Sequence, residues 1–175
     1  MRCSGRRARM PSLPQATTLF TFLAALLACG CRDSTVVTSS MSPTIKRGET
    51  VSVDYTAYAV AAPKRWDVVT FEPPMFTNQV WAMRVVALPG ETVSFATGGV
   101  TLNGRPLMLP PHVTNVTYAS LDDPAFRHAG GGIGSPYVVP PGSYFVLGDN
   151  STNANDSRFW GAVSRTNIFG RVRNK

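Results

Sequence analysis

The chain has 175 residues and a mass of 18.9 kDa, which is enough for one domain with a hydrophobic core. Its net charge of +7 gathers at the start, where four arginines fall within the first nine residues, and the remainder is too weakly basic to indicate a nucleic-acid partner. All cysteines lie within the first 31 residues, which excludes a disulfide framework or a cysteine-based metal site further on. We expect no metal ion and no cofactor.

The first 28 residues are predicted to be an export segment or membrane anchor. Residues 1–18 are basic and polar, and residues 19–28 form an apolar run that is too short for a spanning helix of about 20 residues. The sequence Leu26-Leu27-Ala28-Cys29 resembles the lipobox of bacterial lipoprotein signal peptides, which implies a lipid on Cys29. A lipid anchor, an uncleaved membrane anchor and ordinary cleavage remain open, and each places the following domain on the extracytoplasmic side of a bacterial cell envelope.

Residues 29–35 are expected to form a polar linker, and residues 36–175 one domain that is mostly β. Short strand-like runs occur at residues 49–55, 66–72, 80–88, 92–95, 100–102 and 144–147. Asn103-Gly104 predicts a tight hairpin turn, and no pattern indicates a long amphipathic helix. Residues 106–138 are rich in proline and glycine, which predicts a long inserted surface excursion.

Four segments of this domain carry recognisable motifs. Residues 40–45 are Ser-Met-Ser-Pro-Thr-Ile, residues 66–71 are Trp-Asp-Val-Val-Thr-Phe, residues 84–91 are Arg-Val-Val-Ala-Leu-Pro-Gly-Glu, and residues 148–161 run from Gly-Asp-Asn to Phe-Trp-Gly. In this order they resemble the motifs of bacterial type I signal peptidases, with Trp66 in the place of a glycine. The resemblance covers residues 38–172 apart from the excursion. It implies antiparallel β-sheets, amide hydrolysis by a Ser–Lys dyad, and extended peptide segments of exported preproteins as partners.

The same resemblance assigns candidate roles at the site. Ser40 takes the position of the nucleophile, and it needs a base because a serine hydroxyl is a weak nucleophile. Thr38 takes the position of a second hydroxyl, which would complete an oxyanion hole with the Ser40 N–H. Further positions match the turn and the buried ion pair that shape the family's site, namely Gly148, Asp149, Asn150, Asp156 and Arg158.

Two positions depart from the family pattern. Met83 stands where the family has its general-base lysine, and a thioether cannot act as a base at any useful pH. Ala154 stands where many members have the serine that orients this lysine. The joint loss is chemically coherent, because a buried hydroxyl without the amine would lack its partner.

Three hypotheses about function therefore remain open. The first is a signal peptidase I-like serine endopeptidase with a substitute base, for which Lys46, His112 and His128 are the candidates. The second is a catalytically inactive, peptide-binding pseudoprotease lipoprotein, in which Met83 fills the channel of the lysine. The third hypothesis is a structural or assembly lipoprotein that does not engage peptides. Under the first two, an extended peptide binds between the strand that leads into Ser40 and residues 79–83.

Overall fold

The computed structural model of the protein describes residues 30–95, 99–121, 123–124 and 132–173. The export segment expected at residues 1–28, the candidate lipidation site Cys29 and the candidate base His128 lie outside these residues. Within the described part the chain is mostly β, and every strand pair is antiparallel, as the sequence and the resemblance predict.

The larger sheet contains seven strands. They are β1 (Cys31–Thr35), β2 (Thr50–Asp54), β3 (Val68–Phe71), β4 (Trp81–Ala87), β9 (Ser143–Leu147), β10 (Val163–Ser164) and β11 (Ile168–Val172). Their order across the sheet is β1-β2-β11-β3-β4-β9-β10. Strand β4 thus lies inside the sheet between β3 and β9, and its last five residues are buried.

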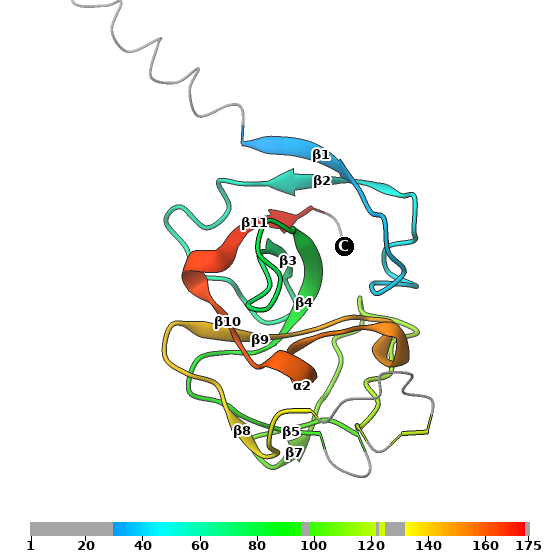
Figure 1. Ribbon diagram of the computed structural model, residues 1–175, viewed down its shortest axis with the longest axis vertical. Helices are drawn as coiled ribbons and strands as arrows, with labels where there is room; N and C mark the ends of the chain where they lie inside the picture. Colours follow the sequence, from blue (N-terminus) through cyan, green and yellow to red (C-terminus); the bar gives the residue numbers. More distant parts are fainter. Residues whose placement is uncertain (1–29, 96–98, 122, 125–131, 174–175) are drawn as a thin grey trace, which may run out of the picture.

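The smaller sheet contains four short strands, β5 (Thr92–Ser94), β6 (Thr101–Leu102), β7 (Arg105–Pro106) and β8 (Tyr137–Val138), in the order β7-β6-β5-β8. Asn103 and Gly104 join β6 to β7 with φ angles of 51° and 77°. Positive φ at both central residues is the requirement of the tight hairpin turn that Asn-Gly predicts. Figure 1 shows β1 and β2 at one end of the long axis and the smaller sheet at the other.

Strand β9 separates two hydrophobic cores. Successive side chains of a strand point to opposite faces of the sheet. Tyr144 and Val146 accordingly pack in a first core with β2, β3 and β11, whereas Phe145 and Leu147 pack in a second core beneath the smaller sheet. The ring centroids of Phe95 and Phe145 lie 6.0 Å apart in this second core.

The expected polar linker contains a strand instead. All five residues of β1 pair with β2, from Cys31 opposite Asp54 to Thr35 opposite Thr50. The segment is polar because β1 is the outermost strand of its sheet and its side chains are mostly exposed. A strand that buries neither face lacks the alternation of apolar residues on which a prediction depends.

The expected surface excursion is partly a core element. Three of its side chains are buried in the second core: Val113, Val116 and Tyr118. The described parts of residues 106–138 therefore contribute to the second core. The proline and glycine content of the segment predicted a surface excursion and gave no sign of these buried side chains.

The helices of the described part are short, as expected: α2 (Ser157–Trp160) and the single 3₁₀ turns η1 (Ser151–Asn153) and η2 (Arg165–Asn167). None of these described helices is long and apolar enough to traverse a bilayer.

Candidate active site

A groove of about 640 Å³ runs between the segment that leads from β1 into Ser40 and the start of β4. It is lined mainly by apolar and hydroxyl side chains. From the first segment these include Val36, Thr38, Ser40 and Met41, and from the second Val80, Trp81, Ala82 and Met83. The structure thus brings Ser40, Thr38 and Met83 together around one groove, although 43 positions separate Ser40 from Met83 in the sequence.

The hydroxyl groups of Ser40 and Thr38 lie next to each other. Their oxygens are 3.1 Å apart, within hydrogen-bond distance, with Ser40 half-buried and Thr38 exposed. The contact places the Thr38 hydroxyl beside the candidate nucleophile, where the resemblance expects the second hydroxyl.

The loop at residues 148–158 holds the backbone of Ser40. The Asn150 N–H donates to the Ser40 carbonyl at 2.9 Å, and the Asn150 side-chain amide donates to the Ser39 carbonyl at 3.1 Å. A Cβ on Gly148 would lie 2.7 Å from the Ser40 carbonyl oxygen and would also collide with Ala154. The close approach therefore requires glycine at position 148.

Asp149 is the centre of a buried polar network. Its carboxylate forms an ion pair with Arg84 at 2.6 Å and accepts hydrogen bonds from the hydroxyls of Tyr118, at 2.8 Å, and Thr44. Thr44 belongs to the segment that begins at Ser40, so the network ties this segment to β4 and to the loop around Tyr118.

Burial and charge shift the pKa values of two members of this network. Burial disfavours the charged form of Arg84, but the hydrogen bonds and the negative charge of Asp149 outweigh it and raise the pKa of this arginine. Burial raises the pKa of Tyr118 well above its usual value, and the adjacent Asp149 carboxylate raises it further. Both groups therefore keep their protons at neutral pH.

Asp156 and Arg158 form a second buried ion pair, at 2.6 Å. Asp156 also accepts a hydrogen bond from the Gly148 N–H at 3.1 Å and caps the first turn of α2. Arg158 donates to the Ser151 hydroxyl and to the Ala119 carbonyl, at 2.7 and 2.8 Å. The pair thus fixes the loop that in turn holds Ser40.

The network around Arg84 was not predicted from the sequence, which suggested only that Arg84 is not a base. A usable signal existed. Arg84 follows Met83 and precedes three apolar residues in a strand pattern, and an arginine at a buried position needs a carboxylate partner. No local pattern pointed to Tyr118.

The chain is similar to proteins of one known family. Residues 11–175 match the family described as "Signal peptidase, peptidase S26". The chain belongs to this signal peptidase family. It is 34% identical over 162 residues to "Signal peptidase I" of Leptolyngbya laminosa, which covers 86% of this chain and 73% of that protein.

Further relatives and a solved structure carry similar names. "Probable signal peptidase I-1" of Synechocystis is 34% identical over 148 residues, which covers 78% of this chain and 66% of that protein. A crystal structure of a signal peptidase I from Enterococcus faecalis is 28% identical, with a TM-score of 0.48, and covers 64% of this chain and 97% of that one.

Within this member of the signal peptidase family, Met83 and Ala154 are both buried. Met83 is 2% exposed in the first core and lines the groove, and Ala154 lies beside Gly148. None of the described residues that line the groove is Lys, His, Asp or Glu.

The candidate substitute bases lie elsewhere. Lys46 is exposed and does not line the groove, and His112 lines a separate pocket. Among the described residues, moreover, no three His, Cys, Asp or Glu side chains cluster in a way that could hold a metal ion.

Proposed function

We propose that this chain binds extended peptide segments of exported proteins in its groove and does not hydrolyse them unaided. One observation carries the proposal: the buried Met83 lines the same groove as Ser40 and Thr38, and the described groove lining contains no Lys, His, Asp or Glu. A serine hydroxyl without a base is too weak a nucleophile for amide hydrolysis.

The groove has the features that main-chain recognition of a peptide requires. In the described part β1 pairs on one edge only, with β2, and the segment that continues it forms one wall of the groove. Val37 and Val80, on opposite walls, are exposed by 74% and 60% and offer apolar surface to a bound chain. An extended peptide would pair with these walls through main-chain hydrogen bonds, and shallow pockets would select small side chains.

We further propose that the groove faces the extracytoplasmic side of a bacterial membrane. In this arrangement residues 1–28 direct export and Cys29 carries the lipid anchor. Mass spectrometry of the mature N-terminus tests this proposal, because a diacylated Cys29 as first residue supports it. An unmodified N-terminus or an intact residue 1 would contradict it.

A second candidate function is hydrolysis by Ser40 with a base that does not line the described groove. The 3.1 Å contact between Ser40 and Thr38 favours this candidate, since the nucleophile and its companion hydroxyl are both retained. The two candidates differ in a single measurable quantity, the amount of product formed from a bound peptide.

The test is a rescue of the dyad. The substrate is a preprotein segment with Ala-x-Ala before the cut, incubated with the wild type, with Met83→Lys/Ala154→Ser, and with the same double variant carrying Ser40→Ala. We expect saturable binding without product for the wild type, and product from the double variant that Ser40→Ala abolishes. Met108→Lys in place of Met83→Lys is the matched control, because Met108 is exposed and does not line the groove.

The other outcomes decide between the candidates. Product from the wild type that is lost on Ser40→Ala would establish the second candidate. A flat binding titration for the wild type would overturn both and leave the structural lipoprotein hypothesis.

A further inference from the structure

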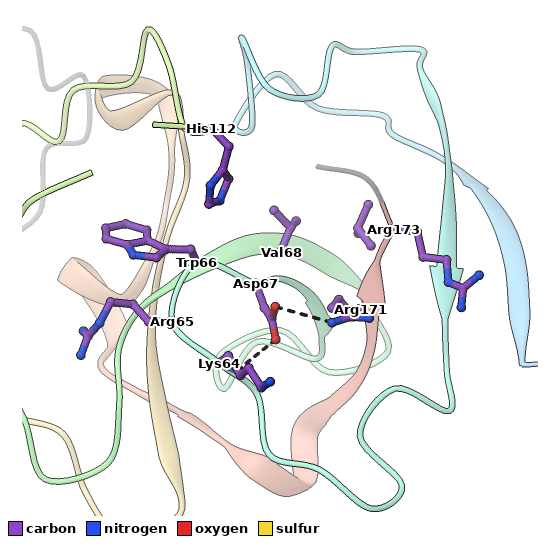
Figure 2. Close-up of a pocket in the computed structure, with 9 residues that line it drawn as sticks. Lys64, Arg65, Trp66, Asp67, Val68, His112, Arg171 and Arg173 are labelled. Carbon is purple, nitrogen blue, oxygen red and sulfur yellow. Dashed lines mark hydrogen bonds and ion pairs between the residues drawn. The ribbon is translucent and has the colours of Figure 1, made fainter. Parts of the chain in front are cut away.

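A second pocket, of about 490 Å³, lies apart from the groove. Its lining comes from three segments: residues 64–68 before and in β3, His112 in the loop after β7, and residues 171–173 at the end of β11 (Figure 2). Four of the lining residues are lysine or arginine and only one, Asp67, is acidic. The volume falls in the range of small-molecule sites, about 300–1,000 Å³.

Two of the arginines are already paired outside the pocket. Arg65 forms an ion pair with Glu91 at 2.5 Å, and Arg173 forms one with Asp54 at 3.2 Å. Figure 2 shows both side chains directed away from the pocket centre. These two residues therefore contribute positive potential but few free donors.

Three other groups keep their donors open. The Arg171 guanidinium lies 4.0 Å from Asp67, at the limit of an ion pair, and makes no hydrogen bond within the described part of the chain. The Lys64 ammonium and the His112 ring also have no hydrogen-bond partner among the described residues. The pocket thus gathers an ammonium, a guanidinium and an imidazole from three separate segments.

Trp66 lines the pocket with an aromatic side chain, and its backbone is strained. Its φ of 77° lies in the left-handed region, which is strained for a bulky residue and free of cost for the glycine that the resembling motif has there. Two hydrogen bonds impose this backbone: the Trp66 N–H donates to the Val85 carbonyl at 2.8 Å, and Arg84 donates to the Trp66 carbonyl at 3.0 Å. Trp66 is half-buried, packs against the second core and also lines this pocket, so its indole is in reach of a ligand bound there.

We propose that this pocket binds a phosphate ester. Lys64, Arg171 and His112 would hold the phosphate, because ammonium and guanidinium groups form their strongest hydrogen bonds with such anions. The organic part of the ligand would lie against Trp66, Val68 and Val172, which form the apolar part of the lining. A soluble phosphate ester and a phospholipid headgroup share this chemistry.

The test measures tryptophan fluorescence of the full chain in neutral detergent at constant ionic strength. One arm titrates glycerol phosphate, and the other adds phosphatidylglycerol to the micelles, with phosphatidylcholine as the comparison lipid. We expect a saturable change that is absent from Trp66→Phe. A change in the first arm identifies a soluble ester as sufficient, and a change confined to phosphatidylglycerol identifies a lipid headgroup.

Charge-matched variants assign the response to the pocket. Lys64→Gln/Arg171→Gln should weaken binding at least tenfold, whereas Lys46→Gln/Arg47→Gln, which removes the same charge from exposed positions outside the pocket, should change it less than twofold. His112→Gln is a second variant at an exposed position and should weaken binding about threefold even if the double variant fails to fold. No saturable change in either arm, a change that persists in Trp66→Phe, or equal losses in pocket and control variants would overturn the proposal.

Discussion

The backbone N–H of Asn150 donates a hydrogen bond to the carbonyl of Ser40, at 2.9 Å. The candidate nucleophile therefore takes its position from a loop that lies more than a hundred residues further along the chain. That loop is itself fixed by two buried ion pairs, Arg84–Asp149 and Asp156–Arg158. The position of Ser40 thus depends on contacts from distant parts of the chain, and changes in the loop at residues 148–158 should alter peptide binding in the groove.

Gly148→Ala should displace the Ser40 turn, because the added Cβ would lie 2.7 Å from the Ser40 carbonyl oxygen. Overpacking of this kind costs about 1–3 kcal/mol of the free energy of unfolding. Denaturant unfolding measures this loss, and a peptide titration should show weakened binding. Gly134→Ala is the control, since its Cβ would meet nothing within 4 Å. Equal stability of the two variants would contradict the close approach.

Met83→Lys should make stability depend on pH. Burial lowers the pKa of an introduced ammonium below its unfolded value of about 10.4, so the folded state favours the neutral amine. The variant should approach wild-type stability above this pH and lose stability as the pH falls from there toward the lowered folded pKa. Denaturant unfolding at pH 7, 9 and 10.5, each against the wild type, measures the effect. Met108→Lys, at a position that is 80% exposed, should show no such slope.

Asp156→Asn should be among the most damaging conservative changes. It removes the buried carboxylate that pairs with Arg158 at 2.6 Å, and breaking a buried ion pair costs about 3–5 kcal/mol. Arg173→Gln breaks an ion pair whose arginine is 53% exposed, and it should cost far less stability than Asp156→Asn. Thermal or denaturant unfolding compares the two. A small loss for Asp156→Asn would mean that water or a rearranged loop can replace the carboxylate.

Tyr118→Phe should reduce the alkaline sensitivity of the fold. Because burial and the Asp149 charge raise the pKa of Tyr118 above its usual value of 10.0, the contribution of this tyrosine to stability is fully present below pH 10 and is lost as the pH rises beyond it. At pH 8 the variant should lose about 1.5–3 kcal/mol, the range for hydrogen bonds to charged groups. As the pH rises above 10, the wild type should then lose more stability than the variant.

The control for this comparison is Tyr55→Phe, which changes an exposed tyrosine. Its pH profile should follow that of the wild type. Parallel profiles for Tyr118→Phe and the wild type would show that the Tyr118 hydroxyl does not depend on Asp149.

Much of the fold could be predicted from the sequence where burial leaves a local pattern. The apolar runs that became β2, β3, β4 and β9 are such cases, and Asn103-Gly104 marked its hairpin because few residue pairs accept positive φ twice. Strand β1 was not predicted, because an outermost strand that buries neither face has no alternating apolar pattern. Strand β11 was not predicted either, since Gly170 interrupts the alternation of apolar side chains at the point where the backbone of Asp54 approaches.

The candidate site was predictable in its members but not in its connections. The motifs indicated Ser40, Thr38, Met83 and the loop at residues 148–158. In the structure the first three residues line one groove, and the loop donates a hydrogen bond to the Ser40 carbonyl. The contacts of Asp149 join residues that lie 31 and 65 positions away, Tyr118 and Arg84. Such contacts arise from the packing of the two cores, and no spacing rule along the chain encodes them.

Strand β1 joins the start of the described chain directly to the wall of the groove. Five residues in extended conformation span about 17 Å, and their full pairing with β2 leaves this stretch little freedom to bend or swing. Under the proposal that Cys29 carries the anchor, β1 would set the height and the direction of the groove above the membrane surface. A peptide that emerges from the same surface would meet the groove only at one depth along its length. Selection by position would then add to selection by side chain.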